Sequence, residues 1–324
     1  MRNLQGDLNS GGTVSMLYGN NHRAIKNLRD EGYGAAGFEI KTVPLYYNAD
    51  REYNLQRSKK YATYRTDTSE ELGVHGENYR AIKPSHMIDT CRNILERSDL
   101  NLNGITEDIQ TSHNGSRTFV QYRLPEVSYS TGDGDHASLS LLGITSFDST
   151  WPFMISAAAI QQACLNLQVF TQGDIALYKS RHTKGIDLDA GARIINDAVH
   201  VFSNETELWQ KWQNQYLTTK DVILLFATTV GCKPILELYK SGAYPSDLDR
   251  SIRASKAMSY IMDKYTHTYK PKFGKTMWSA YNALTDWSTH APAKNNIASV
   301  RNYRQSQVRK FFQGIESNNW LNVA

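Results

Sequence analysis

The chain has 324 residues, of which 40% are hydrophobic and 21% charged, a composition typical of folded globular proteins. Its length predicts about two domains, or one enlarged α+β domain with a helical extension. Its three cysteines, Cys91, Cys164 and Cys232, lie far apart without a C-x-x-C pair. This spacing excludes a disulfide framework and a structural zinc site, and without a signal-peptide core or an apolar stretch of about 18 residues we expect a cytoplasmic protein with no membrane partner. The formal net charge of +4 is unevenly distributed, because residues 251–324 hold eleven Lys or Arg and three Asp or Glu whereas the preceding residues hold 25 and 29.

Residues 1–30 are predicted to form a mobile N-terminal arm. They are rich in Asn and Gly at the start and become mildly helical through His22–Asp30. Next comes Gly32–Gly37, followed by alternating apolar residues through Phe38–Tyr47, which predicts a flexible turn leading into a strand. No strand precedes these glycines and no Lys-Ser or Lys-Thr follows them, so a phosphate-binding loop is not expected.

Residues 51–72 are polar and charged, and two interpretations of them stay open. The simpler one is a solvated loop or arm. The other is a cationic contact for nucleic acid, because cations that attract phosphates alternate here with rings that can stack on bases. The side chains concerned are Arg57, Lys59, Lys60 and Arg65, interleaved with Tyr61 and Tyr64.

Residues 31–203 are predicted to form a core domain of the α+β class. Ser85–Leu100 predicts a helix, because Ser85 can cap it and apolar residues recur at helical spacing behind the cap. A period of two then predicts three strands joined by tight turns, the first turn at Asn114-Gly115. The strands, Ile105–Gln110, Arg117–Tyr129 and His136–Ser146, are expected to form an antiparallel meander with flanking helices. The apolar segment Phe153–Leu167 fits either a buried helix or a strand.

No pattern in the chain predicts a reaction. Asp133 and Asp135 lack the further oxygen ligands of a calcium loop, so we interpret them as part of a hydrophilic turn. His182, between Arg181 and Thr183, suits contact with a phosphate or proton transfer, and a purely structural histidine is the alternative. The apolar surroundings of the cysteines should raise their thiol pKa values, which disfavours nucleophilic catalysis. We therefore expect no catalytic residue, metal or cofactor, and whether the protein is an enzyme stays open.

Residues 204–324 are predicted to form a helical, basic C-terminal region. Eleven aromatic residues lie among the eleven cations of residues 251–324. Such a combination is typical of a surface that binds single strands, although surface helices with an aromatic core and a solvated basic face would have the same composition. Helices are expected over Leu188–Phe202, Glu205–Leu217, Lys220–Gly231, Asp249–Tyr269, Thr276–His290 and Ala298–Gly314.

Four short motifs follow one another along the chain, at Gly76–Ile82, Asn114–Pro125, Ser180–Thr183 and Gly274–Trp278 with Asn282, Ala283, Thr285 and His290. In order and approximate spacing they resemble one family, the phage/plasmid-like proteins classed as a domain of unknown function (DUF932). The resemblance implies an origin in a phage or another mobile element. At Gln162–Leu167 the chain departs from the family pattern, because the arginine expected there is absent. The order of a helix, a meander and a further helix is also similar to the core of single-strand annealing proteins, which implies assembly into rings or filaments.

Together these observations predict a non-catalytic protein that binds or anneals single-stranded DNA in phage recombination or replication and forms homo-oligomers. A protein directed at a host partner, without affinity for nucleic acid, and a metal-dependent nuclease are the alternatives. Phosphates would contact cations of the strands, of the segment around residue 182 and of the last helix, and bases would stack on tyrosines of the second strand. The predicted site residues are Arg117, Tyr122, Arg123, Tyr129, Arg181, His182, Lys184, Arg301, Arg304 and Arg309.

Overall fold

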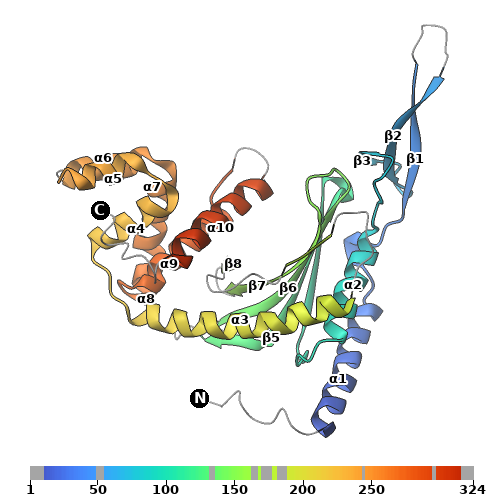
Figure 1. Cartoon of the computed structure of the whole chain (residues 1–324), viewed down its shortest axis with the longest axis horizontal. Coiled ribbons are helices and arrows are strands. Elements are labelled where there is room, and N and C mark those ends of the chain that lie inside the picture. Colours follow the sequence, from blue (N-terminus) through green and yellow to red (C-terminus); the bar gives the residue numbers. More distant parts are fainter. Residues whose placement is uncertain are drawn as a thin grey trace. The chain divides into compact units, whose positions relative to one another are not determined.

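The computed structural model confirms the α+β fold class (Figure 1). It describes residues 11–48, 55–130, 136–161, 167–168, 177–180, 188–242, 245–293 and 297–314. The chain divides into two compact units. Unit 1 comprises residues 1–128, 139–157 and 174–199, and unit 2 comprises residues 129–138, 158–173 and 200–324.

Unit 1 begins with a long helix where the sequence predicted a mobile arm. This helix, α1 (Gly11–Asp30), buries Ile25 and Leu28. Near its end Arg29 donates hydrogen bonds to Asn93 Oδ1 at 2.7 Å and to Glu96 Oε2 at 2.6 Å, both on helix α2 (Pro84–Glu96). The helical tendency predicted for His22–Asp30 is confirmed, and polar contacts with α2 stabilise this part of the helix, whose own sequence is weakly apolar.

Three antiparallel strands form a first sheet in the order β1-β2-β3. A short 3₁₀ turn, η1 (Gly34–Ala36), leads into β1 (Ile40–Asn48), which was predicted, and β2 (Leu55–Arg65) and β3 (Glu71–Gly76) follow. The interpretation of residues 51–72 as a solvated loop is thus wrong over β2. Figure 1 shows β1 and β2 as a twisted ribbon that continues beyond the end of β3. We call these two strands the hairpin.

The predicted meander is present as part of a second, larger sheet. Its strands are β4 (Thr106–Ser112), β5 (Arg117–Ser130) and β6 (His136–Ser146), and the turn η2 (His113–Gly115) joins the first two. The sheet continues through three further strands, with the order β4-β5-β6-β7-β8 and β9 paired with β7. These strands are β7 (Phe153–Gln161), β8 (Leu167–Gln168) and β9 (Leu177–Ser180), so the apolar segment after residue 152 forms a strand.

The core of unit 1 lies between α2 and the second sheet. The predicted apolar stripe of α2 is fully buried, and Tyr122 of β5 donates a hydrogen bond to the Ile88 carbonyl at 3.2 Å. The helix begins at Pro84 without a side-chain cap, so Ser85 does not cap it as predicted. The fully buried residues on the two surfaces include Met87, Ile88, Cys91, Ile94 and Leu95 of α2 and Val120, Tyr122, Leu124, Leu139 and Phe153 of the sheet.

The remaining elements are helical, as the sequence predicted. Helix α3 (Leu188–Asn214) is continuous where two helices were expected, and its residues from His200 onward belong to unit 2. The other helices are α4 (Thr219–Val230), α5 (Lys233–Lys240), α6 (Pro245–Ala254), α7 (Lys256–Lys264), the π-helix η3 (Tyr265–Tyr269), α8 (Lys270–Phe273), α9 (Met277–His290) and α10 (Ile297–Gln313).

Aromatic side chains build the core of unit 2. The ring centres of Trp209 and Trp278 lie 5.4 Å apart. The ring centre of Trp212 lies 5.0 Å from that of Tyr281 and 4.9 Å from that of Phe312. All five are buried. Most C-terminal aromatic residues that suggested stacking on bases therefore stabilise the fold. None of the helices in the described ranges is both long enough and apolar enough to cross a bilayer.

Candidate nucleic-acid interface

Tyr122 cannot stack on a base as predicted. It lies on the same face of β5 as Val120 and Leu124, and all three side chains are fully buried. Its hydroxyl hydrogen bond to Ile88 fixes it against α2, and burial raises the pKa of its phenol well above the ordinary value. The prediction failed because tyrosine on the apolar face of an alternating strand packs in the core.

Arg117 does not present a free guanidinium to solvent. Its Nε donates to Asp148 Oδ2 at 2.6 Å, and the guanidinium lies 5.8 Å from the ring centre of Trp151. Partial burial alone would raise the pKa of Asp148, but hydrogen bonds from Thr150 and from Arg117 outweigh it and hold that pKa below the ordinary value. Arg123, on the same face of β5, is half-buried opposite Thr106 of β4.

The other predicted contacts are divided between unit 2 and segments outside the described residues. Tyr129 is half-buried, with its ring centre 5.9 Å from that of Trp209 in an edge-to-face arrangement, and burial raises its pKa. Arg181, His182 and Lys184 lie outside the described residues, as does the side chain of Arg301.

Arg304 has a structural role in unit 2. It donates hydrogen bonds to the carbonyl oxygens of Trp287 at 3.3 Å, Ala291 at 2.6 Å and Pro292 at 3.1 Å, and its guanidinium lies 5.2 Å from the ring centre of Trp287. These carbonyls belong to the last turn of α9 and the residues after it, so Arg304 caps that helix end. Arg309 is half-buried on the same helix, α10.

The hairpin of unit 1, in contrast, exposes aromatic and basic side chains together. Tyr46 and Tyr47 are 55% and 52% exposed, and Tyr61 and Tyr64 are half-buried. Four cations are exposed on the same two strands: Lys41, Arg57, Lys59 and Lys60. Sequence reasoning considered the cations of β2 as an alternative nucleic-acid contact, but did not place them among the predicted site residues because no strand was expected there.

Strand pairing gathers three of these side chains on one face of the hairpin. Tyr46 lies directly opposite Arg57, and opposite residues of antiparallel strands project to the same face. Arg57 also donates to the Tyr61 hydroxyl at 3.1 Å, with its guanidinium 5.9 Å from the ring centre. A phenol, a guanidinium and a second phenol therefore follow one another along this face.

A bulge in β2 presents the two exposed lysines. Between the pairs Pro44–Tyr61 and Tyr46–Arg57, β1 advances by two residues and β2 by four, so β2 carries extra residues at this point. Lys60 N–H donates to Ser58 Oγ at 3.1 Å within the bulge. Bulges increase the local twist of a ribbon and redirect side chains, and this one turns Lys59 and Lys60 towards solvent beside the tyrosines.

The base of the hairpin is anchored on a small apolar core. Phe38, Leu72 and Phe147 are buried together there. A Cβ atom at position 73 would lie 2.0 Å from the Phe147 carbonyl oxygen, so only glycine fits there. Ser116 Oγ donates a hydrogen bond to the Leu72 carbonyl. The first sheet is therefore fixed to β5 and β6 at one end, while the outer part of the hairpin is bound only by its own two strands.

Among the residues that the structure describes around the hairpin, the acidic ones lie near its base, while Asp50 and Glu52, between the two strands in the sequence, are outside the described residues. The strands β1 and β2 contain five Lys or Arg and no Asp or Glu. Arg65, at the base, donates to Asp67 Oδ2 at 2.6 Å, and Glu70 accepts a hydrogen bond from Asn114. The outer strands thus carry positive charge that no described carboxylate of these strands offsets.

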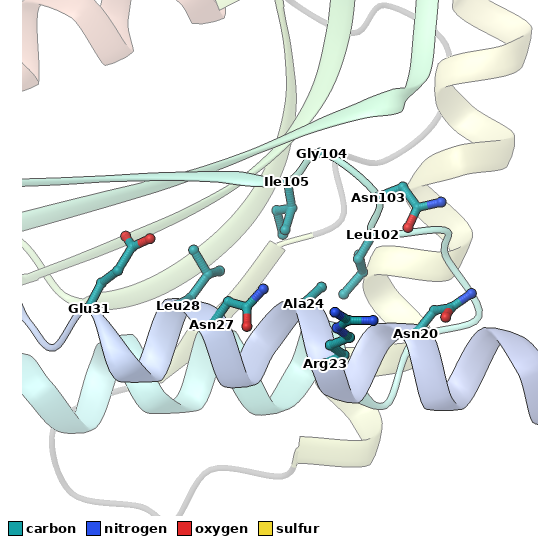
Figure 2. Close-up of a pocket in the computed structure, with 10 residues that line it drawn as sticks. All are labelled: Asn20, Arg23, Ala24, Asn27, Leu28, Glu31, Leu102, Asn103, Gly104 and Ile105. Atoms are coloured by element: carbon teal, nitrogen blue, oxygen red, sulfur yellow. The ribbon is translucent and has the colours of Figure 1, made fainter.

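A separate groove lies between α1 and the residues that precede β4. Its volume is about 510 Å³ and ten residues line it, with Glu31 at one end of the row along α1 and Asn20 at the other, next to Arg23, in Figure 2. Asn21 connects α1 to residues 98–102, because its side-chain amide donates hydrogen bonds to the Ser98 and Leu100 carbonyls and accepts one from Leu102 N–H. One cation and one anion make this groove neutral overall, so it does not extend the cationic surface of the hairpin.

Within the described parts of the chain, no group of three or more His, Cys, Asp or Glu side chains is placed to hold a metal ion. Burial raises the pKa of the Cys91 thiol, as expected from its apolar helix pattern. This thiol is fully enclosed between α2 and the sheet, which makes it a core residue.

Comparison with known proteins identifies one family model. The model described as Domain of unknown function (DUF932) matches residues 71–311. No curated protein and no solved structure matches the chain. The matched stretch starts at β3, so β1 and β2 precede it, and it includes both the second sheet and the helices up to α10.

Proposed function

The chain belongs to the DUF932 family, and on that premise we propose that it is a non-catalytic protein that binds single-stranded nucleic acid through the hairpin of unit 1. The observation that carries this proposal is the joint exposure of tyrosines and cations on β1 and β2. The cations of the meander and of α10 predicted from the sequence do not carry it, because Arg117 and Arg304 are engaged within the fold.

Phosphate attraction is the first component of binding. Lys41, Arg57, Lys59 and Lys60 are exposed on a segment without acidic neighbours in its strands. A single strand that places one phosphate near each of them releases condensed counterions, and its affinity falls by about 0.7 log unit per log unit of salt for each phosphate neutralised. Four such contacts correspond to a slope of about −2.8.

Stacking on bases is the second component. Tyr46 and Tyr47 project from the outer part of the hairpin, and Tyr47 donates a hydrogen bond to Gln56 Oε1 at 3.2 Å. A ring that is half exposed offers a face to an unpaired base, and such stacking contributes about 1–3 kcal/mol per base. Bases inside a duplex already stack on each other, so this component favours single strands.

Fluorescence anisotropy with a labelled oligo-dT strand, titrated at several salt concentrations, tests the proposal. The double substitution Lys59→Gln with Lys60→Gln should make the slope of log affinity against log salt shallower by about 1.4. This corresponds to about 25-fold weaker binding near 0.1 M salt. The substitutions Tyr46→Ala and Tyr47→Ala should weaken binding while the slope stays near its original value. A duplex competitor should displace the strand poorly.

The matched control is Arg23→Gln with Lys26→Gln, which removes two exposed charges from α1. The proposal fails if the unmodified protein does not bind the strand, or if the hairpin lysine variant binds as the α1 variant does. Circular dichroism should show unchanged folding for all variants, because the replaced side chains lie outside the core.

The finer parts of the proposal are annealing of complementary strands in phage recombination and assembly into rings or filaments. Fluorescence transfer between two labelled complementary strands tests the first, and light scattering with and without oligonucleotide tests the second. Two rival functions have distinct outcomes. A metal-dependent nuclease would cut labelled DNA in magnesium or manganese, and a host-directed protein would retain its partner from lysate after nuclease treatment.

A further inference from the structure

Two chain segments of unit 2 meet at an isolated pair of extended residues. Tyr216, after α3, pairs with Thr276, before α9. Leu217 N–H donates to the Lys275 carbonyl and Met277 N–H donates to the Gln215 carbonyl, both at 2.8 Å. These hydrogen bonds fix the backbone of both segments.

Tyr216 projects from this junction into solvent. Its side chain is 80% exposed, the largest exposure among the large hydrophobic residues that the structure describes. Leu217, the next residue, and Thr276, which pairs with Tyr216, are both buried. Because Leu217 and Thr276 are buried and the backbone of residues 215 and 217 is hydrogen-bonded, the exposed ring projects from an anchored stretch of backbone.

The two segments carry lysines and no acidic residue. Residues 211–220 and 264–276 contain six Lys and no Asp or Glu. Lys264 lies 3.7 Å from Asp286. Lys211, Lys220, Lys272 and Lys275 are exposed, with the Lys220 ammonium 4.7 Å from the ring centre of Tyr239 and that of Lys272 5.0 Å from the ring centre of Phe273. Two carboxylates adjoin these segments in the sequence. Asp221 accepts hydrogen bonds from Thr218 N–H at 2.8 Å and Thr218 Oγ1 at 2.7 Å, and Asp263 Oδ1 lies 3.0 Å from His267 Nδ1.

We propose that Tyr216 with Lys220, Lys272 and Lys275, which we call the Tyr216 patch, forms a second contact for single-stranded nucleic acid. The ring stacks on one unpaired base and the lysines attract the phosphates beside it. This inference rests on the proposed function and adds a site within unit 2 that is chemically of the same kind as the hairpin. The patch lies inside the stretch that the family model matches, whereas the hairpin does not.

Photo-crosslinking of the full chain to an oligo-dT strand with bromouracil substitutions provides a test that needs no variant. Mass spectrometry should recover a crosslinked peptide that contains Tyr216. In anisotropy titrations, Tyr216→Ala should weaken binding of the same strand by about 5-fold or more, the lower end of the stacking contribution of one base. Lys272→Gln with Lys275→Gln should reduce the salt slope by about 1.4.

Matched controls exist for both changes. Tyr303→Ala removes a tyrosine that is 65% exposed on α10, and Lys256→Gln with Lys310→Gln removes two exposed lysines elsewhere in unit 2. One outcome overturns the Tyr216 patch and leaves the proposed function standing. In it the unmodified protein binds the strand, the hairpin variants bind it more weakly, and the patch variants bind it with the same affinity as these controls.

The remaining outcomes also decide the question. Weakening by the patch variants with unchanged hairpin variants supports the patch and removes the hairpin from the proposed function. No binding by the unmodified protein overturns both. If the patch substitutions abolish binding to vesicles of anionic phosphatidylserine and leave oligo-dT binding unchanged, the surface recognises membranes and the inference fails.

Discussion

Replacing Glu107 by glutamine should strongly destabilise unit 1. Arg92 of α2 is 1% exposed and donates hydrogen bonds to Glu107 Oε1 at 2.9 Å and Oε2 at 2.6 Å, and also to the carbonyls of Leu28 and Gly32. Burial alone would lower the pKa of Arg92, but the hydrogen bonds and the charge of Glu107 outweigh it and raise that pKa. The guanidinium thus stays charged inside the core. Glu107→Gln removes the compensating charge and turns an amide NH₂ towards donors.

The expected loss follows from the enclosure of the pair. Removing one partner of a buried ion pair costs about 3–5 kcal/mol, because the other charge is left without compensation. For a unit of this size each kcal/mol shifts the melting temperature by about 2–4 °C, so we expect a decrease of roughly 6 to 20 °C. The side chain of Glu107 is only 6% exposed, which leaves water little access to replace the lost interaction.

The assay must report on unit 1. Five of the six tryptophans belong to unit 2, so hydrogen exchange in peptides from α2 and β4, followed by mass spectrometry, is more specific than tryptophan fluorescence. Asp108→Asn is the matched control, because Asp108 is the next residue on β4 and is exposed. It should change the free energy of unfolding by about 0.5 kcal/mol or less. Equal protection in the two variants would refute the reasoning.

Two further substitutions give equally direct outcomes. Gly115→Ala should destabilise the base of the hairpin by about 1–3 kcal/mol, because φ is +97° and the new Cβ would lie 2.7 Å from the ring of Phe38; faster hydrogen exchange in β3 measures this, and unchanged exchange would contradict it. Tyr260 donates to Asp286 Oδ1 at 2.6 Å, and burial followed by that hydrogen bond raises its pKa, so the folded state favours the neutral phenol. That stabilisation is present below the ordinary pKa of 10.0 and is lost as the pH rises above it. Alkaline unfolding of unit 2, followed by circular dichroism, should therefore depend less on pH in Tyr260→Phe than in the original protein, and an identical pH dependence would disprove the assignment.

Local signals were sufficient for much of the fold. Asn114 adopts a positive φ at the predicted turn, and alternation on either side of it predicted β4 and β5. Several later helices, such as α4, α9 and α10, also follow their sequence patterns, since glycines and prolines mark most of their ends, whereas α3 is continuous where two helices were expected and α6, α7 and η3 cover the single helix expected over Asp249–Tyr269. In these segments, side-chain periodicity and turn chemistry agree with the tertiary structure.

The hairpin shows where such reasoning stops. Over Arg57–Lys60 no apolar alternation exists, because none of these side chains is buried, and this part of the strand is specified by its pairing with β1. Contacts with another element also stabilise α1, where Arg29 donates hydrogen bonds to Asn93 and Glu96 of α2. Tyr122, in contrast, could have been placed correctly, because its apolar neighbours at two-residue spacing already assigned it to the core.

The outer half of the hairpin has an evolutionary consequence. Strand β3 pairs with β2 only over Lys60–Tyr64, so the residues beyond this point contribute to no packed interior. Under the proposed function, substitutions of Tyr46, Tyr47 and Arg57 would alter which strand is bound and leave the folded scaffold intact. The outer hairpin could then change its specificity over time at little cost in stability.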